Sequence, residues 1–173
     1  MVIGLDGMPL AQLKTGVGHY TFELARALAL TEPSIEFAFV SPSTFPPQQD
    51  STSFPHNLKS IVVPVGVATR HWWSFGLPLY LKGSELELFH GTNYDIPLWG
   101  GRTKVLTVHD LSLLIHPETH RPRAVRRARR RLPLMTKRAD AVIVPTKAVK
   151  REVIARLQLN DEKIFVVPEA ART

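Results

Sequence analysis

The sequence has 173 residues, 44% of them hydrophobic, which is enough for one globular domain with a sizeable core. It has no cysteine, which excludes disulfide bonds and thiolate metal ligands. The net charge of +7 is local, because residues 121–138 hold eight arginines and one lysine, and removing those nine leaves 13 basic against 15 acidic residues. Residues 1–6 do not form a signal peptide and no apolar run could span a bilayer, so we expect a cytoplasmic protein.

The N-terminal part reads as a strand, a glycine turn and a helix. An apolar run at residues 2–5 precedes Gly16-Val17-Gly18, which opens an amphipathic segment extending to about Leu30. Glycines allow another group to approach the backbone, and the N-terminus of the following helix favours an anion such as a phosphate. The dinucleotide fingerprint is incomplete, since Thr21 replaces its third glycine, and no P-loop lysine follows. A close-packed turn and a phosphate site both remain open.

The rest of the chain alternates strand-like and helix-like segments. Proline-rich residues 41–55 are expected to form a long loop, and a helix is expected over residues 147–157. The aromatic stretch 71–81 is bent by Gly76 and Pro78; its rings pack on the sheet or, alternatively, hold a lipid or sugar. Further strands are expected at residues 35–40, 61–63, 86–90, 104–108, 141–144 and 164–167. This alternation predicts an α/β fold with a doubly wound parallel sheet covered by helices on both faces.

Polar residues recur where strands of this sheet end, which is where ligands bind in such folds. His90-Gly91-Thr92-Asn93 follows one apolar strand, and His109-Asp110 follows the next. His109 can act as an acid, a base or a hydrogen-bonding group near neutral pH. Asp110 can orient a neighbour or cap the next segment, although such a pair is also common as a purely structural feature.

Two other kinds of catalytic site are rejected. His116-Pro117-Glu118-Thr119-His120 lacks the zincin pattern and a helix long enough to align its histidines, so we expect no metal site. A serine nucleophile is unsupported, because no Gly-x-Ser-x-Gly motif exists.

The arginine-rich segment is amphipathic, with Val125, Ala128, Leu132 and Met135 on one side and Arg123, Arg126, Arg127 and Arg130 on the other. Pro133 is expected to kink it. A solvated helix face, a face on an anionic membrane and a nucleic-acid surface are the three interpretations. Nucleic acid is the least favoured, because no aromatic side chains are interleaved with the arginines.

As an ordered set, several pieces of the chain resemble the N-terminal domain of a retaining glycosyltransferase of the GT-B type, glycosyltransferase group 1 with its "glycosyltransferase 4-like" domain. The resemblance extends over the whole chain. The matching pieces are residues 16–28, Leu88 to Tyr94, Thr107 to Leu111 with His116-Pro117-Glu118, Arg138 to Thr146 and Lys163 to Ala170.

The resemblance implies one half of a GT-B fold, with residues 1–173 as a Rossmann-like acceptor-binding domain and the C-terminal donor-binding domain absent. It also implies a metal-independent enzyme with no cofactor, in which a nucleotide sugar is the co-substrate. The implied site residues are His109 and Asp110 for catalysis, the donor phosphate loop Gly16, Val17 and Gly18, the acceptor cleft His90, Thr92, Asn93 and Tyr94, and the anionic-surface residues Arg123, Arg126, Arg127, Arg130 and Arg131.

The sequence departs from the family pattern at Thr146, where serine is frequent, and at Glu169-Ala170, where Asn-Gly is frequent. It also stops where the family would enter its donor domain, so we expect a chain that transfers little sugar alone. Its expected partners are a sugar or lipid-linked acceptor, the missing C-terminal domain and an anionic membrane surface, on whose inner face the protein would be peripheral. The alternative function is a non-enzymatic module whose arginine-rich helix binds anionic lipid or nucleic acid.

Overall fold

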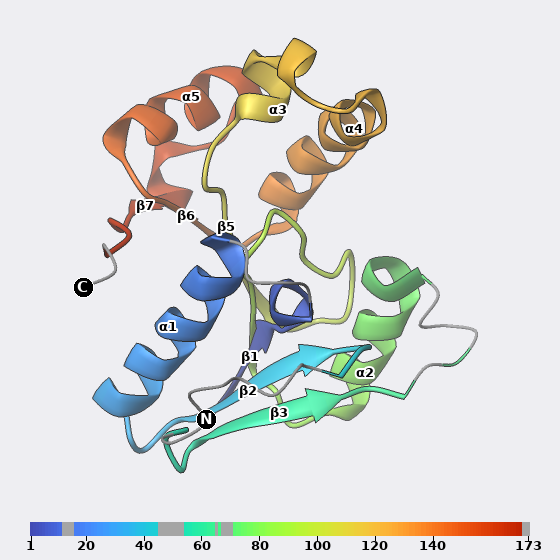
Figure 1. The fold of residues 1–173 in the computed structure, drawn as a ribbon, viewed down its shortest axis with the longest axis vertical. Coiled ribbons are helices and arrows are strands. Elements are labelled where there is room, and N and C mark those ends of the chain that lie inside the picture. Colours follow the sequence, from blue (N-terminus) through green and yellow to red (C-terminus); the bar gives the residue numbers. More distant parts are fainter. Residues whose placement is uncertain (12–15, 45–53, 65, 67–70, 171–173) are drawn as a thin grey trace.

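A computed structural model describes residues 1–11, 16–44, 54–64, 66 and 71–170 (Figure 1). Its centre is a seven-stranded sheet in the order β3-β2-β1-β4-β5-β6-β7, with every neighbouring pair parallel. The predicted parallel α/β sheet is therefore confirmed. Its strands are β1 (Val2–Asp6), β2 (Glu36–Ser41), β3 (Leu58–Val62), β4 (Leu88–Gly91), β5 (Thr103–Thr107), β6 (Ala141–Val144) and β7 (Ile164–Val166).

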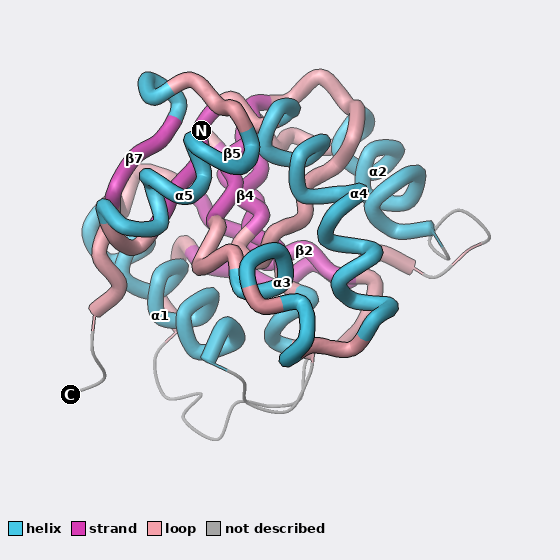
Figure 2. Tube along the Cα trace, turned by 90° about the horizontal axis from the view of Figure 1, so that it is seen from above, coloured by secondary structure: helices cyan, strands magenta, loops and turns pink. Residues whose placement is uncertain are grey.

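Helices follow β1, β3, β5 and β6 in sequence and lie around the strands in space, so that in Figure 2 the strands run through the interior. The longer helices are α1 (Gly16–Thr31), α2 (Leu77–Gly83), α4 (Pro122–Arg138) and α5 (Lys147–Leu157). The short ones are η1 (Met8–Leu10), the π-helix η4 (Trp72–Gly76), α3 (Ser112–Ile115), η5 (Pro117–Thr119) and η6 (Asp161–Lys163). The predicted boundaries of α5 and β6 agree with the structure residue for residue.

The alternation of side chains along β2 shows that both faces of the sheet are covered. Phe37 and Phe39 pack in one apolar cluster with residues of α1, whereas Ala38 and Val40 pack in another with residues of η4 and α2. Because successive side chains of a strand point to opposite faces, α1 and α2 must cover opposite faces of this part of the sheet. Figures 1 and 2 both show the two helices flanking these strands.

The structure corrects or refines the sequence pattern at three places. The third strand is β3, which begins three residues before the predicted start at Ile61, because Leu58 anchors it in the α1 cluster. The aromatic stretch is divided: Trp72 is buried, but Phe75 projects into solvent from the π-helix. Helix α4 continues without a break through Pro133. The predicted long loop lies mostly outside the described residues.

The turn after β4 is the tightest backbone packing at the ligand-facing edge of the sheet. A Cβ atom built on Gly91 would collide with the carbonyl oxygen of Asp95 and lie 2.7 Å from Cγ2 of Ile96. Glycine is therefore required for the chain to fold back on itself here.

We predict that Gly91→Ala lowers the free energy of unfolding by at least about 3 kcal/mol, because the rigid backbone of Asp95 has to move. Gly83→Ala is the control, since a Cβ on Gly83, the last residue of α2, meets open space. That variant should change stability by less than about 1 kcal/mol. Urea denaturation followed by circular dichroism measures both, and similar midpoints for the two variants would contradict the assignment.

Candidate functional site

The site lies where the order of strands reverses. The chain proceeds from β1 outward to β2 and β3, and then returns to place β4 on the other side of β1. Connections therefore leave β1 and β4 in opposite directions, which opens a crevice beyond their carboxyl ends. A cavity of about 530 Å³ occupies this position, and its walls include Asp6, Trp73, Asn93, Tyr94, Asp110 and Arg131.

The loop after β4 supplies one wall of the cavity through an unusual backbone conformation. Tyr94 has a φ of 61°, in the left-handed region that non-glycine residues seldom adopt. Its amide donates to the carbonyl of Thr107 at 3.3 Å, and its hydroxyl accepts from the amide of Asp110 at 3.1 Å. Burial, reinforced by the charge of Asp110, raises the pKa of the Tyr94 phenol, so this group stays neutral.

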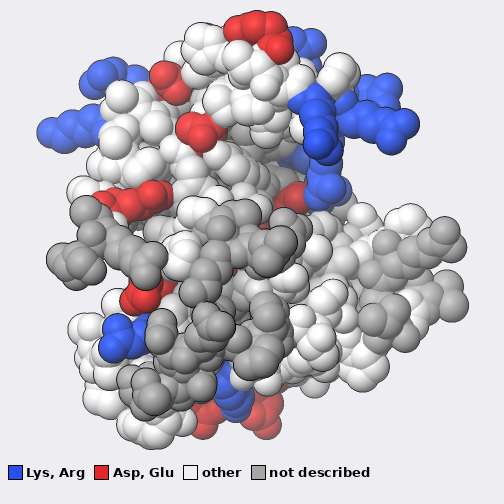
Figure 3. All heavy atoms as spheres, viewed as in Figure 1, with Lys and Arg blue, Asp and Glu red and all other residues white. Residues whose placement is uncertain are grey.

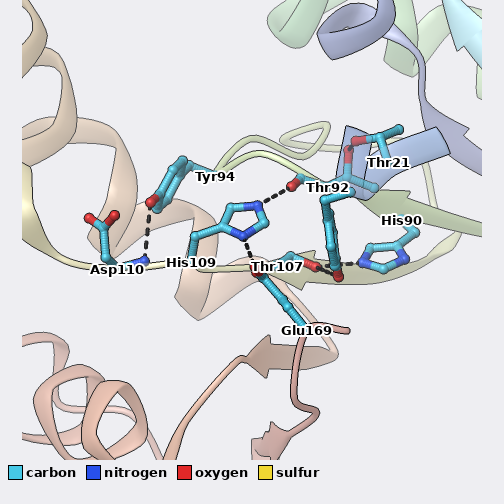
Figure 4. Close-up of polar contacts among 9 residues, drawn as sticks. Thr21, His90, Thr92, Tyr94, Thr107, His109, Asp110 and Glu169 are labelled. Carbon is cyan, nitrogen blue, oxygen red and sulfur yellow. Dashed lines mark hydrogen bonds and ion pairs between the residues drawn. The ribbon is translucent and has the colours of Figure 1, made fainter. Parts of the chain in front are cut away.

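His109 lies at the centre of the polar contacts in Figure 4. Its Nδ1 is 2.6 Å from Oε1 of Glu169, and its Nε2 is 2.8 Å from the carbonyl oxygen of Thr92. The rings of Tyr20 and Tyr94 meet the imidazole edge-on, with centroids 4.9 Å and 5.8 Å away. These contacts hold the ring in one orientation beside the cavity.

Two residues expected in the acceptor cleft lie beneath it instead of lining it. His90 is buried, with Nε2 2.8 Å from the hydroxyl of Thr107, and Thr92 is fully buried, accepting a hydrogen bond from Thr21 of α1 at 2.8 Å. Burial, with a smaller contribution from the charge of His109, lowers the pKa of His90 to about 4, so its ring is neutral near pH 7. Asn93 and Tyr94, the other two, do line the cavity.

Asp110 is exposed at the rim, where it has a structural contact as well as access to the cavity. Its Oδ1 accepts the amide of Ser112 at 2.8 Å, which starts helix α3. This is a local turn contact between Asp110 and the first residue of α3; the N-cap position itself is held by Leu111, which has no side-chain cap.

Gly16, Val17 and Gly18 form the first turn of α1 rather than a separate loop, while residues 12–15 lie outside the described part. Val17 reaches the cavity wall. In the next turn Tyr20 contacts both His109 and the hydroxyl of Thr107, so the N-terminal end of α1 lies against the site.

Two buried carboxylates were not among the predicted site residues. Asp6 ends β1 inside the cavity wall, and burial, with a smaller contribution from Asp95, raises its pKa from 3.8 to about 7. Asp95 ends the glycine turn and accepts from Arg127 at 2.7 Å and from Arg131 at 2.8 Å. The position of Asp6 at the end of the first strand was the available signal, whereas nothing in the sequence pairs Asp95 with residues more than 30 positions away.

The five arginines expected on one anionic surface divide into two groups. Arg127 and Arg131 turn toward the cavity and neutralise Asp95. The remaining three, Arg123, Arg126 and Arg130, are exposed and have no ion pair with any residue in the described ranges. In Figure 3 basic side chains project together at the upper right, on the side where Figure 1 places α4. Among the described residues no group of three or more histidine, aspartate or glutamate side chains is placed to hold a metal ion.

Several solved structures share this fold with the chain. One is Anabaena Alr3699/HepE in complex with UDP and glucose (TM-score 0.58, 17% identity, covering 96% of this chain and 43% of that one). Another is a glycosyltransferase from Rickettsia africae ESF-5, with a TM-score of 0.52 and 11% identity, covering 96% of this chain and 42% of that one. A third is the H444N variant of the wall teichoic acid polymerase TagF, with a TM-score of 0.52 and 13% identity, covering 96% of this chain and 37% of that one. The chain spans less than half the length of these proteins, and at such identities the likeness concerns the fold alone.

The sequence itself decides the family. Residues 14–172 match the model of Glycosyltransferase Family 4, so the chain belongs to this family and the predicted resemblance is confirmed. A search of curated proteins found no significant match.

We predict that Asp6→Asn becomes progressively more stable relative to the wild type as the pH rises from 4 to 7. The pKa of Asp6 is about 7 in the folded protein against 3.8 for the free side chain, so the folded state binds more protons in this interval. The contribution of the protonated Asp6 to the free energy of unfolding is therefore largest below about pH 4, and it is lost as the pH rises to 7. The difference should reach up to about 4 kcal/mol.

Urea denaturation of both proteins between pH 4 and 8 provides the measurement. The lowered pKa of His90 acts in the opposite sense over the same interval, but it is common to both proteins and cancels in the difference. A stability difference that does not change with pH would show that Asp6 is ionised in the folded protein.

Proposed function

We propose that this chain is the acceptor-binding domain of a retaining glycosyltransferase that moves a sugar from a nucleotide-sugar donor to a sugar or lipid-linked acceptor. The observation that carries the proposal is the cavity at the switch point, with His109 held beside it by Thr92 and Glu169. Family membership supplies the reaction class, and the cavity supplies a place for an acceptor.

The walls of the cavity suit a carbohydrate. Asp110 and Asn93 offer carboxylate and amide groups that bind hydroxyls, while Trp73 and Tyr94 offer aromatic surface for the apolar face of a sugar ring. Two arginines and three carboxylates lie in the wall, and Asp6 is partly protonated near neutral pH. The charges therefore nearly balance, which favours a neutral polyhydroxylated group over a strongly charged one at this point.

The donor would lie on the α1 side. The first turn of a helix carries a partial positive charge that stabilises a diphosphate, and Gly16, Val17 and Gly18 form this turn. His109 lies close by and would contact the donor sugar and its leaving diphosphate without the help of a metal. A second domain, outside this chain, would bind most of the nucleotide, so the chain alone should transfer little sugar.

The direct test uses the longest natural protein that contains these residues, compared with residues 1–173 alone. Each is incubated with UDP-, GDP- and CDP-sugars and a lipid extract, and release of nucleoside diphosphate and sugar incorporation are measured. We predict activity only for the longer protein, with His109→Ala lowering kcat by at least about a hundredfold.

His116→Ala is the matched control, because His116 is an exposed histidine in the next segment of the same chain. Its activity should equal that of the wild type. Undiminished activity of His109→Ala, or sugar transfer by residues 1–173 alone, would contradict the assignment.

A second feature supports a membrane surface as a partner. Phe75, Leu79, Trp99 and Leu134 are between 38% and 53% exposed. Two hydrogen bonds connect their segments: Trp99 donates to the carbonyl of Ser74 at 2.8 Å, and Arg138 donates to the carbonyl of Leu98 at 2.7 Å. Leu134 lies about one turn after Arg130 on α4, and exposed apolar side chains combined with exposed arginines suit the interface of an anionic bilayer better than they suit nucleic acid. No helix in the described residues is long and apolar enough to cross a membrane.

We predict that replacing Arg123, Arg126 and Arg130 together by glutamine weakens binding to phosphatidylglycerol-containing vesicles by roughly a hundredfold, since each basic residue contributes about 1 kcal/mol. The control replaces Lys147, Arg151 and Arg156, three exposed basic residues of α5, by glutamine, which makes the same change in net charge. Vesicle sedimentation measures both variants.

If both triple variants lose the same affinity for the vesicles, only the net charge of the protein matters. If the wild-type protein binds pure phosphatidylcholine vesicles as tightly as phosphatidylglycerol-containing ones, electrostatic attraction does not contribute to binding. Salt-dependent binding to DNA without binding to vesicles would favour the nucleic-acid alternative.

A further inference from the structure

Glu169 lies 60 residues after His109 in the sequence, yet its carboxylate makes the shortest contact of the imidazole (Figure 4). The other ring nitrogen faces the carbonyl oxygen of Thr92 at 2.8 Å. Each nitrogen of the ring thus faces an oxygen within hydrogen-bonding distance.

The two contacts fix where protons lie. A carbonyl oxygen only accepts, so Nε2 of His109 carries a proton and donates it to Thr92. The Nδ1–Oε1 contact of 2.6 Å then requires one proton between nitrogen and carboxylate. With that proton on nitrogen the pair is an imidazolium and a carboxylate.

The surroundings leave the ring no alternative orientation. Tyr20 from α1 and Tyr94 from the glycine turn meet it edge-on, Asp110 follows it in the chain, and His90 lies below it on β4. The His109 side chain is only 13% exposed, and the half-exposed Glu169 approaches from the segment that follows β7. Of the titratable groups around the ring, Glu169 alone forms an ion pair with it among the described residues.

From this arrangement we propose that Glu169 is a positioning residue for His109, which holds the imidazole in one orientation with both ring nitrogens protonated. The functional part rests on the proposed glycosyltransferase activity: a cationic ring beside the site stabilises the negative charge that develops on a departing diphosphate. Nε2 is already committed to Thr92, so the ring serves as an electrostatic group and not as a general base through that nitrogen.

The test observes the ring itself, by nitrogen-15 NMR of the histidine side chains of residues 1–173 at neutral pH. We expect both nitrogens of His109 to show shifts of the protonated type, with a slowly exchanging downfield Nδ1–H signal. In Glu169→Ala that signal should disappear and Nδ1 should move to the unprotonated range, while Nε2–H stays on Thr92. Glu169→Asp should restore the signal in part.

A second His–Glu pair in the chain provides the control. His116 and Glu118 are 3.4 Å apart and exposed, so Glu118→Ala changes the same charge without touching His109. Its His109 spectrum should match the wild type. An unprotonated Nδ1 in the wild-type protein, or identical His109 spectra for Glu169→Ala and the wild type, would overturn the proposal.

The effect of Glu169 on sugar transfer can be measured separately from its effect on the protonation of His109. In the longer natural protein Glu169→Gln should lower kcat by at least about tenfold with little change in the KM for the donor. If the wild-type protein transfers no sugar, the proposed function fails while the NMR result still stands. If transfer occurs and kcat is unchanged in Glu169→Gln, the positioning role fails while the proposed function stands.

Discussion

The turn after β4 is the constraint on which the site depends. Gly91 lies so close to the backbone of Asp95 that no side chain fits, and this contact folds residues 91–95 into a compact bend. Three groups along the bend then make different contacts. The carbonyl of Thr92 lies within hydrogen-bonding distance of His109, and the ring of Tyr94 packs edge-on against the imidazole. The carboxylate of Asp95 forms ion pairs with two arginines of α4. The left-handed conformation of Tyr94 is maintained by these contacts, in keeping with the usual location of backbone strain at functional sites.

The buried ionisable side chains of the site are either paired with an opposite charge or held in their neutral form. Asp95 is compensated by two guanidinium groups, whereas Asp6 forms no ion pair with any of the described residues and accepts the amide of Met8 with a raised pKa. His90 is neutral for the same reason, because burial disfavours its charged form and so lowers its pKa. The charged groups in the wall of the cavity, two arginines and three carboxylates with Asp6 partly protonated, are consequently close to balance.

Much of the fold was predictable, because strand and helix periodicities are local properties of the sequence. Residues 141–144 and 147–157 have the predicted boundaries, and His90, near the end of β4, and His109, two residues after β5, lie at the carboxyl ends of their strands. The rest depends on contacts between distant residues. The pairing of Arg127 and Arg131 with Asp95 removes two residues from an apparently uniform basic face, and the contact of Glu169 with His109 joins segments 60 residues apart. The burial of Thr92 also depends on the packing of α1, through Thr21. No pattern within a window of sequence contains such information.

The reversal of strand order has a consequence for how the molecule folds and responds to ligands. β1 and β4 are adjacent in space, although their paired residues Ile3 and Leu88 are 85 positions apart in the chain (88 − 3). The unit formed by β1, α1 and β2 can assemble from local contacts, but the crevice does not exist until the C-terminal strands dock beside it. A ligand in the crevice therefore binds only the completed sheet, so its binding energy would add to the cooperative stability of the whole domain instead of stiffening one loop.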